Sequence, residues 1–263
     1  MNRAMAESTG RGAPAASPGP APRPLPLGAR CDAWAARVLP WCVATCALSL
    51  TGGLVLALVA APQDFLHGDA YRIVFAHAPA SASSVALYVA LVASAMAVVA
   101  LSGELPAMMA RAIAPVGALM AFLSLWTGAM GARAMRGLWL EWDARNLAEG
   151  VMLTVCITAT ALYMLLDAPR RADRAAAWLV LASVPVLALP VVLDRLWRVG
   201  PAPHAGVAPP PPADASVVWA LALMHLAFLT WSLASVLHRL RTVLIERALG
   251  AAAVRDAAPS GRG

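Results

Sequence analysis

Six long runs of apolar residues, separated by short charged segments, most constrain how this chain of 263 residues can fold. The runs are Val38–Gln63, Ile73–Gly103, Ala112–Ala132, Gly150–Leu166, Ala175–Leu193 and Ala215–Leu237. A helix needs about 20 mostly apolar residues to cross a bilayer, and lipid offers no partner for backbone N–H and C=O groups. The runs therefore predict an all-α, polytopic membrane protein with six transmembrane helices.

The composition supports this interpretation and excludes several classes of protein. Apolar residues make up 60% of the chain and charged residues 13%, whereas soluble globular proteins carry roughly 25% charged residues. The deficit excludes a disordered chain, a secreted disulfide scaffold and a soluble nucleic-acid-binding protein, despite the net charge of +6. We therefore expect the chain to lie in a lipid membrane and to bind no nucleic acid.

The arginines predict the orientation of the helices. All 20 basic residues are arginines, and a cytoplasmic N-terminus would place fourteen of them on the cytoplasmic side and six on the other. Because cytoplasmic loops are enriched in basic residues, we expect both termini in the cytoplasm. The expected organisation is a disordered Pro/Ala-rich cytoplasmic tail at 1–37, a six-helix membrane domain at 38–245 with an outer loop at 131–147, and a cytoplasmic tail at 246–263.

With this topology, histidine, tryptophan and charged side chains gather in the three loops on the outer side. These residues are His67, His77, Trp139, Trp142, Asp143, Arg145, Trp197 and His204. Imidazole is a good ligand for transition metals, while indole and guanidinium suit a flat ligand that carries carboxylates. A haem has both features. The alternative is that the tryptophans only anchor the chain at the membrane interface and that the histidines have no role.

Two segments resemble motifs of a known family. The segment from Trp126 to Arg145, with its Trp-Asp-Ala-Arg end, resembles the tryptophan-rich "WWD" signature of the haem-handling proteins of cytochrome c maturation. Upstream, Tyr71-Arg-Ile-Val-Phe-Ala-His77-Ala-Pro-Ala resembles the first histidine motif of the haem exporter protein C family. Downstream, Trp197 and His204 fall where that family has a Trp-containing outer loop with its second histidine. The resemblance covers roughly residues 38–245.

The resemblance implies a multi-pass protein of the bacterial inner membrane that presents haem b on the periplasmic face. His77 and His204 would ligate the iron. The remaining haem-binding residues would be Trp139, Trp142, Asp143, Gly137 and Arg145. Such a protein is an assembly factor and not an enzyme. Its partners would be a periplasmic haem chaperone that receives the haem, an ABC-type ATPase with its membrane subunit, and a small single-span subunit.

The sequence also departs from the signature. Three positions that are typically aromatic there hold Gly131, Arg136 and Leu140. Outside the motifs, we interpret His225 as a helix-packing residue within the last span. We expect Glu149 to lie in the first turn of its helix, where the helix dipole favours a carboxylate.

Two other functions compete with haem presentation. A bis-histidine membrane cytochrome, or another integral electron-transfer subunit, would place its ligands inside the bundle, where only His225 lies well within a span. A plain transporter would carry buried charged pairs of the kind that mark ion pathways, and the spans contain none.

Overall fold

The computed structural model is a bundle of six long helices and describes residues 27–64, 67–101, 103–139, 144–197 and 214–257. The long helices are α1 (Leu27–Val55), α2 (Val74–Leu101), α3 (Glu104–Arg136), α4 (Ala144–Leu165), α5 (Pro169–Trp197) and α6 (Ala215–Ala257). A π-helical turn, η1 (Leu56–Ala60), and a 3-10 turn, η2 (Asp69–Ile73), lie between α1 and α2. Within these ranges the regular secondary structure is helical, apart from an isolated β-bridge between Asp64 and Gly68.

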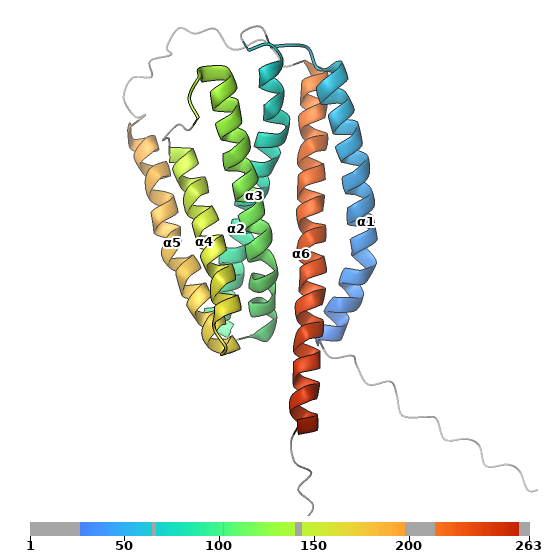
Figure 1. Cartoon of the computed structure of the whole chain (residues 1–263), viewed down its shortest axis with the longest axis vertical. Helices are drawn as coiled ribbons and strands as arrows, with labels where there is room; N and C mark the ends of the chain where they lie inside the picture. The colour runs from blue at the N-terminus through green and yellow to red at the C-terminus, as the bar shows by residue number, and fades with distance from the viewer. Residues whose placement is uncertain (1–26, 65–66, 102, 140–143, 198–213, 258–263) are drawn as a thin grey trace, which may run out of the picture.

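Successive helices run in opposite directions, and α1 lies beside α6 (Figure 1). The start of α1 and the end of α6 lie at one end of the bundle, which we call the terminal end. The start of α2, the end of α3 and the start of α4 lie at the other end, which we call the histidine end because it holds His77. The short connections between α2 and α3 and between α4 and α5 require this alternation.

Small side chains form much of the core where α2 to α6 meet. Fully or almost fully buried alanines recur on these helices, at Ala95, Ala112, Ala114, Ala121, Ala159 and Ala176. Small residues allow helix backbones to approach closely, which is how helices associate in lipid, where apolar burial supplies little driving force. The α1–α6 pair follows the same rule, with Ala35 and Ala234 in its contact.

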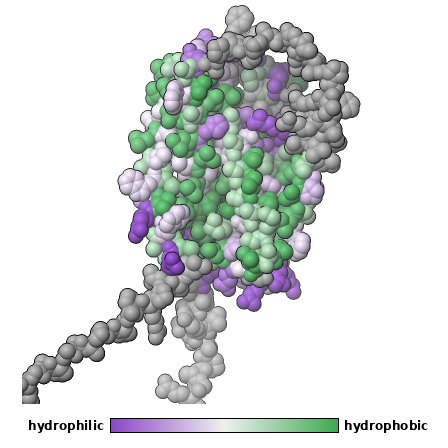
Figure 2. All heavy atoms as spheres, turned by 180° about the vertical axis from the view of Figure 1, so that it is seen from behind, coloured by the Kyte–Doolittle hydropathy of each residue, from purple (hydrophilic) through white to green (hydrophobic). Residues whose placement is uncertain are grey.

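The outside of the bundle is apolar. Large side chains such as Leu48 (77% exposed), Val59 (81%) and Met164 (77%) point away from the core. Figure 2 shows apolar residues covering the middle of one face, with hydrophilic residues mostly towards its ends. A soluble monomer rarely exposes an apolar surface this large, so the bundle is built for a membrane.

Among the residues that the structure describes, five helical segments are long and apolar enough to cross a membrane by length and composition, where the sequence predicts six. They correspond to α1 with η1, η2 with α2, α3, α4, and the part of α6 up to Arg247. The helix expected as the fifth span, α5, is present but is not among the five. Four of its first six residues are charged, namely Arg170, Arg171, Asp173 and Arg174, and the predicted span Ala175–Leu193 follows them without a charged residue.

The helices extend beyond the apolar runs. Residues 27–37, expected in a disordered tail, belong to α1, and α6 continues to Ala257. The segment 131–147, expected as a loop, is helical up to Arg136 and again from Ala144. Alanine, arginine and leucine are strong helix formers in polar surroundings as well, so the end of an apolar run marks the edge of the membrane and not the end of the helix.

Ion pairs hold the helices together at the terminal end. Arg241 of α6 contacts Asp32 of α1, with 2.7 Å between Nε and Oδ1. Asp173 of α5 accepts from Arg111 of α3 at 2.7 Å and from Arg247 of α6 at 3.3 Å. A single carboxylate therefore links three helices.

Candidate functional site at the histidine end

Two side chains in the segment before α2 donate hydrogen bonds to backbone carbonyl groups and hold the segment in place. The guanidinium of Arg72 donates to the carbonyl oxygens of Ala57, within η1, and of Ala61, the residue that follows it. The hydroxyl of Tyr71 donates to the carbonyl of Pro62 at 2.6 Å. Carbonyl groups at a helix end have no partner within the helix, so these side chains complete η1 and fix where α2 begins.

His77, in the first turn of α2, has a defined ring orientation. Its Nδ1 lies 3.0 Å from the backbone carbonyl oxygen of Ser124 and 3.3 Å from the hydroxyl of Thr127, both on α3. A carbonyl oxygen only accepts hydrogen bonds, so Nδ1 carries the proton. In the neutral ring, Nε2 then keeps its lone pair. This is the usual arrangement of a metal-ligating histidine, whose other nitrogen donates to a backbone carbonyl or a carboxylate.

The close approach of α3 to this ring depends on Gly128. A Cβ atom at this position would lie 3.1 Å from Cε1 of His77 and 3.4 Å from Nδ1. A larger residue here would contact the imidazole more tightly than usual, so the ring would have to shift by a few tenths of an ångström. Glycine therefore allows the hydrogen bond that orients His77.

A buried carboxylate lies beside the histidine. Glu149 of α4 is 3% exposed and accepts hydrogen bonds from the hydroxyls of Ser81 at 2.7 Å, Ser84 at 2.9 Å and Ser124 at 3.1 Å. These hydroxyls come from α2 and α3, so the cluster joins three helices. Since Ser124 also supplies the carbonyl that orients His77, the cluster and the imidazole share one residue of α3.

Arg145 connects this cluster to the surface. Its Nη2 donates to the hydroxyl of Ser81 at 3.1 Å, and its side chain is otherwise exposed at the start of α4. A cavity of about 230 Å³ is lined by His77, Thr127, Gly128, Arg136, Arg145 and Asn146, among others. Pockets for drug-sized ligands measure roughly 300–1,000 Å³. The cavity therefore has room for the edge of a large planar ligand, whose remainder would lie outside it.

This arrangement can bind a metal through Nε2 of His77 and an anionic group through Arg145. Residues 25–255 match the model of the family described as "Heme exporter protein C". The chain belongs to this family.

Curated relatives carry the same description. "Heme exporter protein C" of Escherichia coli K12 is 33% identical over 154 residues, which are 59% of this chain and 62% of that protein. The Bradyrhizobium diazoefficiens protein of that description is 34% identical over 157 residues, covering 60% of this chain and 59% of the relative. The Paracoccus denitrificans protein is 28% identical over 221 residues, or 83% of this chain and 91% of the relative. The chain thus matches less than two thirds of the first two relatives.

The structure places four of the site residues that the resemblance to the heme exporter protein C family indicated. His77 and Arg145 lie on the same cavity. Gly137 caps the end of α3 with a φ of 79°, a left-handed conformation that favours glycine, so the helix end alone accounts for a glycine here. Trp139 is 61% exposed, and the guanidinium of Arg133 lies 5.8 Å from its ring centroid. Trp142, Asp143 and His204 lie outside the described residues.

Several residues of the site were not expected from the sequence. Ser81, Ser84 and Ser124 belong to no motif. Ser81 and Ser84 are polar residues one turn apart in an apolar span, and this pattern can indicate a buried polar contact. Glu149 was expected in the first turn of its helix. It lies in the second, because α4 begins at Ala144, and its partners are hydroxyls of two other helices.

The other histidines have different partners. His225 lies within α6, and its Nδ1 donates to the carbonyl of Leu221 at 2.8 Å, one turn earlier on the same helix. His67 lies outside α2, with its Nδ1 3.0 Å from a carboxylate oxygen of Asp64.

Proposed function

We propose that this chain binds haem at the histidine end of the bundle and passes it on during cytochrome c maturation, as an assembly factor and not as an enzyme. The observation that carries the proposal is the orientation of His77, whose Nδ1 donates to Ser124 and leaves Nε2 for the iron. The family name points to the same cargo.

The surrounding residues suit a haem b held without covalent bonds. His77 would be one ligand of the iron, and His204, which lies outside the described residues, would be the other. Trp139 and Trp142 would bind the porphyrin through their indole rings, and Asp143 and Gly137 would be further haem-binding residues. Arg145 holds Ser81 with one nitrogen, and its remaining N–H groups can pair with a propionate, because guanidinium and carboxylate match in geometry.

The proposed topology has six spans, with both termini in the cytoplasm of a bacterium and the histidine end facing the periplasm across the inner membrane. A periplasmic haem chaperone then receives the haem at that face. An ABC-type ATPase with its membrane subunit, and a small single-span subunit, complete the complex.

Visible absorption spectra of the purified protein test the ligand assignment. We expect a haem spectrum from the parent protein that changes in the His77→Ala variant and is restored by added imidazole, which can occupy the vacated position. His204→Ala should behave in the same way. His225→Ala is the matched control and should leave the spectrum unchanged, because its imidazole lies on another helix within the span.

Two results would overturn the proposal. A parent protein that binds no haem when haem is supplied would remove its basis. A spectrum that is lost in His225→Ala and retained in His77→Ala would favour the bis-histidine cytochrome, in which the ligands lie inside the bundle.

A further inference from the structure

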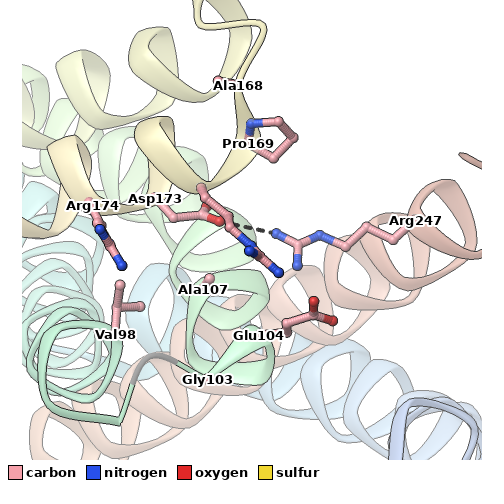
Figure 3. Close-up of a pocket in the computed structure, with 10 residues that line it drawn as sticks. Val98, Gly103, Glu104, Ala107, Ala168, Pro169, Asp173, Arg174 and Arg247 are labelled. Carbon is pink, nitrogen blue, oxygen red and sulfur yellow. Dashed lines mark hydrogen bonds and ion pairs between the residues drawn. The ribbon is translucent and has the colours of Figure 1, made fainter. Parts of the chain in front are cut away.

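We propose that a cavity at the terminal end of the bundle binds the phosphate headgroup of an anionic phospholipid. The cavity measures about 800 Å³. Four helices form its walls, with Val98 from the end of α2, Glu104 from the start of α3, Arg174 from α5 and Arg247 from α6 (Figure 3). It lies at the opposite end of the bundle from His77, so it is separate from the haem site.

The charges around this cavity leave an excess of guanidinium groups. Three arginines line it, at positions 170, 174 and 247, together with the carboxylates of Glu104 and Asp173. Asp173 already contacts two guanidiniums, those of Arg111 and Arg247. Within the described ranges, Arg170 and Arg174 have no ion-pair partner and are exposed. Exposed guanidinium groups without a carboxylate partner are suited to a phosphate, which they bind through paired N–H donors.

The position of the cavity along the bundle favours a lipid over a free anion. His77 and Val98 are 21 residues apart on the same helix, which corresponds to about 31 Å at ~1.5 Å per residue. This is close to the roughly 30 Å thickness of a bilayer's hydrocarbon core. With His77 at one membrane surface, Val98 and the cavity therefore lie at the depth of the headgroups on the other.

The walls of the cavity combine an apolar side with a charged side, which match the acyl chains and the phosphate of a phospholipid. Val98 and Ala107 provide an apolar side, and Leu101, the last residue of α2, is 72% exposed. A headgroup phosphate can contact Arg170 and Arg174 while its acyl chains follow the outer surface of α2. Basic pockets between transmembrane helices are known to bind anionic headgroups in this way. A free phosphate would use only the charged side.

Native mass spectrometry of the full chain in detergent tests the proposal, with phosphatidylglycerol, phosphatidylcholine and inorganic phosphate as the three probes. We expect one phosphatidylglycerol to bind at least tenfold more tightly than phosphatidylcholine. The Arg170→Gln/Arg174→Gln variant should bind phosphatidylglycerol about 25-fold more weakly, at roughly fivefold per arginine near a membrane surface.

A matched control separates the cavity from general surface charge. The Arg171→Gln/Arg239→Gln variant removes two exposed arginines from the same end of the bundle, neither of which lines the cavity. It should retain phosphatidylglycerol binding within about twofold of the parent. Equal losses of phosphatidylglycerol binding in the two variants would overturn the proposal. Equal binding of phosphatidylglycerol and phosphatidylcholine by the parent protein would also overturn it, and this comparison requires no variant. Displacement of the lipid by millimolar inorganic phosphate would assign the site to a free anion instead.

Discussion

Glu149 belongs to no sequence motif, and its contribution to the site comes from the side chains that it contacts. Its carboxylate accepts hydrogen bonds from three serines on two neighbouring helices. One of them, Ser124, carries the carbonyl that orients His77. The ring of a histidine that binds metal depends on such outer partners, so a change at Glu149 should affect both the stability of the bundle and the binding of haem.

We predict that Glu149→Ala lowers the free energy of unfolding by about 2 kcal/mol, because three hydrogen bonds between membrane helices are lost at ~0.6 kcal/mol each. Glu149→Gln should cost less, since an amide of the same size still accepts and donates hydrogen bonds. Unfolding of the purified variants in detergent measures both effects. Glu246→Ala, which removes an exposed carboxylate, is the control, and a loss at Glu149 no larger than in this control would contradict the prediction.

At the scale of elements, the start of α6 illustrates how a helix terminus is set by a single side chain. Asp214 precedes the helix, and its backbone carbonyl accepts from Val217 at 3.0 Å. The hydroxyl and the backbone N–H of Ser216 both donate to its carboxylate. These two hydrogen bonds, that of the hydroxyl above all, hold the pKa of Asp214 below its ordinary value. Aspartate is a preferred N-cap for this reason.

The lowered pKa of Asp214 predicts a pH dependence with a definite sign. The cap should be fully effective above the ordinary pKa of aspartate and should weaken as the pH falls through the lowered pKa of the folded state. Hydrogen-exchange protection at residues 216–218 should therefore fall in acid. Asp214→Asn should keep this protection at neutral pH and lose its pH dependence, because asparagine caps as well as aspartate, whereas Asp214→Ala should lose protection at every pH. Protection in Asp214→Ala equal to that of the parent would refute the capping role.

The orientation of the whole molecule can be tested at one residue of each end. We predict that a cysteine introduced by Ala134→Cys, in a variant lacking the four native cysteines, reacts with a membrane-impermeant reagent in intact spheroplasts. Ala134 is exposed near the end of α3. Arg239→Cys, near the terminal end, is the counterpart and should react only after lysis. The reverse pattern would place the histidine end in the cytoplasm and would remove the periplasmic part of the proposal.

The sequence alone predicted the all-helical membrane bundle, because an apolar run in lipid has to satisfy its backbone hydrogen bonds internally. It also singled out His77 and Arg145, since their motifs lie in continuous stretches of chain. It did not predict where the helices end, because helix formers continue α3 and α6 past the membrane edge. Trp142, Asp143 and His204 lie outside the described residues and remain predictions from the resemblance.

Only the tertiary structure decided which side chains meet. Ser81 and Glu149 are 68 residues apart in the chain, and Asp173 and Arg247 are 74 apart. Contacts of this kind depend on the rotation of each helix about its own axis, which is set by how small residues such as Gly128 and Ala121 let neighbouring backbones pack. An apolar run that faces lipid on one side and other helices on the other carries little periodic signal, so the buried polar contacts between helices emerge only when all of them are packed together.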